Sequence, residues 1–232
     1  MKVSLMQPNI FMWCGLLKSI IDSDLHIIRD DVKITKNSRY NRNNICGDSP
    51  KKIWLTIPFV SFHDHKLIKE QYLSTSVRDK RKVLSTFKSR YSKFKYYKTS
   101  LNIISETLDF EKEKTCLTEV YIAFLNSLRS IGLPICKTVL ASEFLKNRKD
   151  CQKLKGLDMV NYLLKEAQAT SYLAAENTIN YANPKSYEVS RVCLQKYIQV
   201  PYSQRKLDEK DSFIPNLSCL DLLASENISN VM

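Results

Sequence analysis

The chain has 232 residues, enough to bury the core of one large domain or of two small ones. Its 44% apolar and 26% charged residues are typical of a globular protein, and its four glycines are too scattered for the phosphate loop of a Walker ATPase or a dinucleotide-binding fold. The net charge of +12 is compatible with an anionic partner, but by itself it does not predict nucleic-acid binding.

The seven cysteines are dispersed along the chain. No two of them are spaced C-x-x-C, and no histidine lies at zinc-finger spacing from any of them. We therefore predict reduced thiols and no metal site. The sequence does not identify a cofactor, which stays unknown. No apolar run approaches the roughly 18 residues that a membrane-spanning helix requires. Together these features predict a cytoplasmic protein with no transmembrane segment.

Residues 1–75 have the pattern of an α/β unit. Apolar runs at Val3–Met6 and Leu25–Ile28 predict strands, and the helical spacing of apolar residues over Ile10–Ile21 predicts a helix between them. Strand, helix and strand in this order predict a βαβ crossover in a mostly parallel sheet, whose carboxyl edge usually carries the site. Ile53–Ile57 is predicted as the third strand.

The polar stretch from Lys36 to Lys52 is predicted to be mostly loop, and residues 76–224 to be mainly helical. Apolar residues recur at helical spacing in several segments, and two apolar runs predict late strands. The expected helices are 84–94, 101–108, 117–128, 157–167 and 217–223, and the expected strands are 136–141 and 192–198. The predicted fold is α/β: an N-terminal βαβ-type, mostly parallel sheet packed with a larger helical portion. We expect a single domain over residues 1–232, with 225–232 as a frayed tail.

Five motifs occur in the order found in one known family. They are Gln7-Pro8 followed by Trp13 and Gly15, Asp30-Asp31-Val32 followed by Lys36, Asn41-Arg42-Asn43 with Ile45, Trp54-Leu55-Thr56-Ile57-Pro58, and a late group with Tyr202 and Phe213-x-Pro215-x-x-Ser218-x-x-Asp221. In these motifs the chain resembles the WbqC-like protein family from residue 3 to about residue 224.

The resemblance implies a bacterial protein connected with surface-polysaccharide (O-antigen) biosynthesis. It implies a transferase that modifies an activated sugar or amino-sugar precursor, and other polysaccharide-synthesis enzymes are possible partners. Two alternatives stay open: a non-catalytic partner of glycosyltransferases, and a tRNA-dependent aminoacyl transferase. The resemblance fixes neither the donor nor the acceptor.

Asp30 and Asp31 are the candidate catalytic residues. They follow an apolar strand, and carboxylates at the carboxyl edge of a sheet can orient a sugar hydroxyl or act as a base. Asp31 is the predicted base. The alternative is a pair of turn or helix-capping aspartates.

Lys36, Asn41, Arg42 and Asn43 form the candidate substrate-binding cluster. The arginine fork fits a phosphate or a carboxylate, and asparagine both donates to and accepts from sugar hydroxyls. The alternative is a solvated loop in a chain rich in asparagine.

Four further substrate-binding candidates come from the first and the last motif. Gln7 could present its amide and Trp13 its ring to substrate, unless they form a turn and a core position. Tyr202 and Asp221 belong to the late motif, where Ser218 and Asp221 could instead cap a helix. Cys14 lies within the first motif and is predicted to be a core residue.

The segment 76–98 carries nine Lys or Arg residues and one Asp, with five aromatic residues between them. It could hold tRNA, a nucleotide or an anionic membrane surface. The alternative, which we favour, is a helix that packs on its aromatic stripe and exposes its lysines to solvent.

Overall fold

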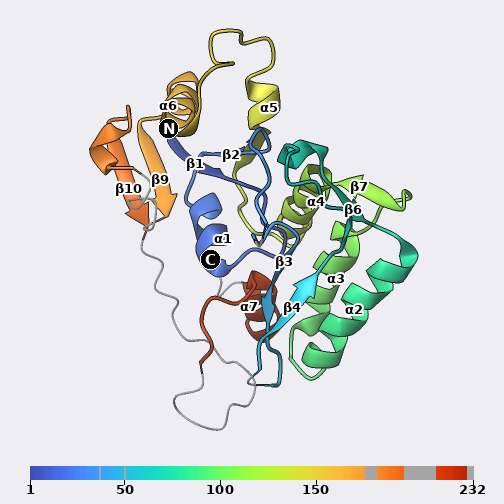
Figure 1. Cartoon of the computed structure of the whole chain (residues 1–232). Helices are drawn as coiled ribbons and strands as arrows, with labels where there is room; N and C mark the ends of the chain where they lie inside the picture. The colour runs from blue at the N-terminus through green and yellow to red at the C-terminus, as the bar shows by residue number, and fades with distance from the viewer. Residues whose placement is uncertain (37, 50, 176–181, 196–212, 229–232) are drawn as a thin grey trace. The chain divides into compact units, whose positions relative to one another are not determined.

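The computed structural model describes residues 1–36, 38–49, 51–175, 182–195 and 213–228 (Figure 1). The chain divides into two compact units. The sheet unit comprises Met1–Gln7, Lys18–Asp31 and Cys136–Ile198, and the helical unit comprises Pro8–Leu17, Val32–Ile135 and Gln199–Met232. Helix α1 (Cys14–Ile21) begins in the helical unit and ends in the sheet unit.

The sheet unit contains one parallel sheet of five strands in the order β10-β9-β1-β2-β8. The strands are β1 (Lys2–Met6), β2 (Leu25–Ile28), β8 (Lys137–Leu140), β9 (Ser171–Ala175) and β10 (Arg191–Gln195). β1 lies in the middle, with β2 and β8 on one side and β9 and β10 on the other. The order of the strands therefore reverses direction at β1, which in such sheets favours a binding crevice at the carboxyl edge beside it.

The strands of this sheet alternate between two faces, as the period of two residues requires. Val3 and Leu5 pack in one apolar cluster with buried residues of α6 (Gly156–Glu166). Ser4 and His26 are also buried, and the Ser4 hydroxyl is hydrogen-bonded to Nδ1 of His26 at 2.9 Å. Each of these two buried polar side chains thus has a hydrogen-bond partner inside the unit. Short α5 (Ala141–Phe144) and the 3-10 turn Pro184–Ser186 complete the described elements of this unit.

The helical unit combines helices with two small antiparallel sheets. Its helices are α2 (Val77–Tyr91), α3 (Tyr97–Thr107), α4 (Leu117–Ser130) and α7 (Cys219–Ser225), with a 3-10 turn at Ile68–Glu70. One sheet pairs β3 (Arg42–Ile45) with β4 (Ile53–Thr56), and the other has the order β5-β6-β7, formed by β5 (Phe59–Ser61), β6 (Tyr72–Ser74) and β7 (Lys114–Cys116). α3 packs against α2, α4 and α7 (Figure 1).

Aromatic contacts fill the core of the helical unit. Phe11 meets Phe124 of α4 edge to face, with ring centres 5.8 Å apart, and Phe87 stacks on Tyr91 at 4.3 Å. All four side chains are fully buried. Because Phe87 and Tyr91 both lie on α2, the prediction that this helix packs on its aromatic stripe is confirmed.

The predicted α/β fold is confirmed, including the parallel βαβ unit β1-α1-β2. The predicted helices match α2, α3, α4, α6 and α7, and the strand predicted at 136–141 is β8. The strand predicted at 192–198 matches β10 as far as Gln195, and residues 196–198 lie outside the described residues. Of the predicted frayed tail, 229–232 also lie outside them.

One detail of the prediction is wrong. The strand predicted at Ile53–Ile57 does form as β4, but it pairs antiparallel with β3 and lies outside the parallel sheet. The stretch from Lys36 to Lys52, predicted to be mostly loop, contains one short strand that was not predicted, β3. This strand looks polar in the sequence because of Asn43, yet Asn43 and Ile45 are both fully buried. Strands β5, β6, β7 and β9 were not predicted either.

No helix in the described part of the chain is long and apolar enough to cross a membrane.

Candidate functional site

The carboxyl edge of the parallel sheet brings three of the candidate residues together. Gln7 directly follows β1. Asp30 and Asp31 follow β2 and are separated from its last residue by Arg29. The two strands are in register, and the Arg29 amide donates to the Met6 carbonyl at 2.8 Å beyond the last strand pair. Gln7 and the two aspartates therefore occupy neighbouring positions on one edge of the sheet.

Asp31 is held by a two-pronged ion pair with Arg29. Nε of Arg29 donates to Oδ1 at 2.7 Å and Nη2 donates to Oδ2 at 3.1 Å. Both side chains are mostly buried, with 12% of Arg29 and 14% of Asp31 exposed. The paired guanidinium fixes the orientation of the carboxylate, and Asp31 can still accept a hydrogen bond through its remaining lone pairs.

Asp30 is buried, and its carboxylate accepts hydrogen bonds within its own unit. Its Oδ1 accepts from the Ser142 amide at 2.9 Å and its Oδ2 accepts from the Ser142 hydroxyl at 2.5 Å. Ser142 is the second residue of α5, and the first amides of a helix have no partner within it. Asp30 thus caps the start of α5, although it lies 112 residues earlier in the chain. This agrees with the capping alternative. Its predicted catalytic role stays a prediction.

In the helical unit, three of the four residues of the predicted substrate-binding cluster line one hollow of about 300 Å³. They are Lys36, Asn41 and Arg42. The other lining residues supply four hydroxyls and an aromatic pair: Thr35, Ser38, Tyr40, Thr56, Phe59 and Phe62. A few charged groups beside an apolar wall are typical of small-molecule sites. We call this the anion hollow.

Arg42 lies on β3 with its guanidinium over the ring of Trp54 on β4, 4.6 Å from the ring centre. The two residues come from adjacent strands, and this contact holds the charged group in place. Within the described residues, no carboxylate lies within ion-pair distance of Arg42. Its donors can therefore bind an anionic ligand without first breaking an ion pair.

Lys36 has a carboxylate partner. Its ammonium is 3.0 Å from Oδ2 of Asp64, and both side chains are more than half exposed. The hydrogen bond and the charge of Lys36 lower the pKa of Asp64. Because an exposed pair of this kind is weak, Lys36 can exchange Asp64 for another anion at little cost.

Asn41 and Asn43 are buried, and their amides bond to backbone groups of the protein. Asn41 Nδ2 donates to the Ile57 carbonyl at 2.7 Å, and Asn43 Nδ2 donates to the Phe11 carbonyl at 2.9 Å. These bonds join β3 and the residue before it to the segments that contain Ile57 and Phe11. The predicted contacts of both amides with substrate hydroxyls stay a prediction.

Trp13 is half-buried and lies across the start of α1. A β-carbon on Gly15 would overlap its ring, which explains why glycine follows two residues after this tryptophan. Its backbone forms a β-bridge with Ser218, the residue that caps α7 through its hydroxyl. The first and the last motif of the sequence therefore meet in the helical unit. The capping alternative for Ser218 is confirmed.

Asp221 is fully buried in α7. Its Oδ1 accepts a hydrogen bond from the Tyr91 hydroxyl, and the Cys46 thiol lies 3.6 Å from the same oxygen. Burial and the charge of Asp221 raise the pKa of Tyr91 well above its usual value. Contact of Asp221 with substrate stays a prediction, and Tyr202 lies outside the described residues.

All seven cysteines are free thiols. Cys14 is 3% exposed, and burial together with the nearby charge of Asp221 raises its pKa to about 12. A thiol of this kind is protonated at neutral pH and is a poor nucleophile, as expected of the predicted core residue. No cluster of three His, Cys, Asp or Glu side chains suited to a metal ion occurs among the described residues.

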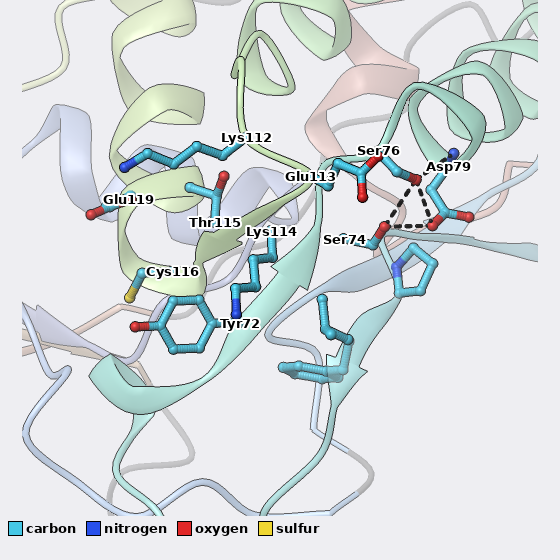
Figure 2. Close-up of a pocket in the computed structure, with 13 residues that line it drawn as sticks. Tyr72, Ser74, Ser76, Asp79, Lys112, Glu113, Lys114, Thr115, Cys116 and Glu119 are labelled. Atoms are coloured by element: carbon cyan, nitrogen blue, oxygen red, sulfur yellow. Dashed lines mark hydrogen bonds between the residues drawn. The ribbon is translucent and has the colours of Figure 1, made fainter.

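Another hollow of the helical unit was not predicted from the sequence. It measures about 830 Å³ and lies along β5, β6 and β7, with Tyr72, Ser74, Asp79 and Cys116 among its lining residues (Figure 2). Of the sequence motifs, only the last residue of one, Pro58, lines it. Its other walls come largely from β5, β6 and β7, and β7 is distant from the other two in the chain. The only local signal is Ser76-Val77-Arg78-Asp79, which has the pattern of a helix start.

The model of the WbqC-like protein family matches residues 7–232, which confirms the resemblance that the motifs indicate. No curated protein and no solved structure matches the chain.

Proposed function

Since the chain belongs to the WbqC-like protein family, we propose that it is a cytoplasmic transferase that modifies a sugar or amino-sugar precursor of a bacterial surface polysaccharide. The anion hollow supports this proposal most strongly. An activated sugar carries a phosphate or diphosphate group, and Lys36 and Arg42 line one hollow with four hydroxyl side chains. Two cations and several hydroxyls suit a ligand that joins phosphate to sugar.

Arg42 is the main anion-binding group of this proposal. It has no carboxylate partner among the described residues, whereas Lys36 must leave Asp64. The ring of Trp54 orients the guanidinium before the ligand arrives, which lowers the cost of binding. Lys36 adds a second, movable charge, while Asn41 and Asn43 hold the strand that carries Arg42.

Asp31 is the proposed base of the transfer step. The acceptor hydroxyl or amine attacks the transferred group of the donor, the bond from that group to its leaving group breaks, and the leaving group departs with the electron pair. The proton of the acceptor passes to the Asp31 carboxylate as the new bond forms. Arg29 orients that carboxylate through two hydrogen bonds. Gln7, on the same edge of the sheet, is proposed to orient the acceptor, and Asp30 to hold the backbone of that unit through Ser142. In the helical unit, Trp13 and Asp221 are proposed as substrate contacts. Tyr202 is proposed as a further substrate contact.

The test is genetic and chemical. In the organism that carries this gene, the gene is deleted and the surface polysaccharide is analysed by mass spectrometry. Complementation with the wild-type gene should restore the missing group, and complementation with Arg42→Ala or Asp31→Asn should not. Arg39→Ala is the matched control, because Arg39 also lies over Trp54, at 5.7 Å, but does not line the hollow.

Thermal melting of each purified variant separates lost chemistry from lost folding. Restoration of the polysaccharide by both Arg42→Ala and Asp31→Asn would contradict the proposed transferase. It would favour a non-catalytic partner of glycosyltransferases instead.

A further inference from the structure

The 830 Å³ cavity has no role in the function proposed above. Its floor is the outward face of the β5-β6-β7 sheet, where Tyr72 is 46% exposed and Leu73, its neighbour, is fully buried. The volume lies in the range of sites for small organic ligands. We call it the sheet cavity.

One end of the sheet cavity carries a carboxylate in a fixed position. The hydroxyls of Ser74 and Ser76 both donate to Oδ2 of Asp79, at 2.5 Å and 3.1 Å (Figure 2). Oδ1 of Asp79 accepts no hydrogen bond from any residue that the structure describes. The hydrogen bonds from the two serines lower the pKa of Asp79, so it is charged at neutral pH and has one oxygen left to accept from a ligand.

The other end offers a flat apolar surface. Tyr72 lies there beside Cys116 and Glu119, and the ammonium of Lys114 is 5.9 Å from the centre of its ring (Figure 2). An exposed tyrosine ring presents an apolar face for the C–H groups of a ligand and a hydroxyl at its edge. The cavity thus pairs an apolar face with acceptors and donors for hydroxyl groups.

The charges around the cavity nearly cancel. Three acidic and two basic side chains line it: Asp79, Glu113, Glu119, Lys112 and Lys114. A polyanion such as nucleic acid would meet repulsion here, whereas an uncharged ligand rich in hydroxyls finds both donors and acceptors.

The sheet cavity adjoins the anion hollow. Phe59 lines both of them. Its ring lies 5.3 Å from that of Phe62, at an angle of 73°, so the shared wall is apolar. A ligand held by its phosphate at Arg42 can therefore extend past Phe59 toward Tyr72.

We propose that the sheet cavity is a saccharide subsite, in which Tyr72 packs on the face of a sugar ring and Asp79 accepts hydrogen bonds from its hydroxyls. The proposal rests on the proposed function in one respect: the same ligand carries the phosphate that the anion hollow holds. The neutral half of the ligand lies in the sheet cavity and the anionic half in the anion hollow.

The test compares the affinities of UDP and UDP-glucose by titration calorimetry. Wild-type protein should bind UDP-glucose more tightly than UDP. Tyr72→Ala should lower this ratio of affinities roughly 2- to 10-fold, the range of an aromatic contact, and leave the affinity for UDP unchanged. Tyr72→Phe should keep the ratio, and so should Val77→Ala, a control at a residue that is 65% exposed and outside the cavity.

Equal affinities of the wild type for the two compounds, or an unchanged ratio in Tyr72→Ala, would overturn the subsite. If neither compound binds, the anion hollow fails, and saturation-transfer NMR with the methyl glycosides of glucose, galactose and mannose decides about the cavity. A saturation-transfer signal from a glycoside that is seen with the wild type and lost in Tyr72→Ala would support the saccharide subsite. It would contradict only the proposed function. Transfer to none of them would overturn both.

Discussion

The Tyr91 hydroxyl donates a hydrogen bond to the carboxylate of Asp221, 130 residues further along the chain, inside the core of the helical unit. This bond joins the last turn of α2 to α7. The Tyr91 hydroxyl also accepts from the Cys46 amide at 3.1 Å. A buried carboxylate needs such partners, because an unsatisfied charge in the core is costly.

We expect Tyr91→Phe to destabilise the protein by about 2 kcal/mol, because Asp221 stays buried and loses a hydrogen bond to its charge. Denaturant unfolding of the purified variant measures this change. The aromatic ring stays in place in Tyr91→Phe, so the change in stability reports the lost hydroxyl and not lost packing. A stability of Tyr91→Phe equal to that of the wild type would show that the Asp221 carboxylate does not depend on this bond.

The thiols should differ in their reactivity toward iodoacetamide at pH 8. Burial raises the pKa of Cys14 to about 12, and it also raises those of Cys46 and Cys219, so these three hold almost no thiolate. Cys116, Cys136 and Cys193 are partly exposed and should react first. Peptide mapping by mass spectrometry reads each site, and denaturation should make all seven reactive. Fast alkylation of Cys14 in the folded protein would contradict its core position.

Asp64 should compete with substrate for Lys36. Asp64→Asn removes the charge that pairs with Lys36, so we expect tighter binding of inorganic pyrophosphate, by no more than about fivefold for so exposed a pair. The gain should disappear in the double variant Asp64→Asn, Lys36→Ala. Weaker binding by Asp64→Asn would indicate that Asp64 itself helps to hold the ligand.

Periodicity in the sequence predicts the fold well where burial is regular. The runs around Val3 and Leu25 give β1 and β2, and the helical stripe through Phe87 and Tyr91 gives α2. Periodicity does not reveal β3, because Asn43 is polar and yet buried. Its amide is hydrogen-bonded to the carbonyl of Phe11, 32 residues away. A local pattern cannot reveal a polar residue whose partner is distant in the chain.

The same limit applies to the candidate site. Lys36, Asn41 and Arg42 lie close together in the chain, so their clustering at one hollow could be expected from the sequence. The sheet cavity could not, since Tyr72 and Cys116 become neighbours only through the pairing of β6 with β7. Nor does the sequence show that Arg29 holds Asp31, or that Asp30 reaches Ser142.

The central claim is that Arg42, placed by Trp54, holds the anionic group of the substrate. Titration calorimetry of the purified protein with inorganic pyrophosphate tests it most directly. Arg42→Ala should weaken binding about tenfold or more, as expected when a charge-assisted contact is lost, and Arg39→Ala should change it less than about twofold. An equal loss of affinity in the two variants would show that only the net charge matters, not the position of Arg42. Unchanged binding by Arg42→Ala would contradict the claim.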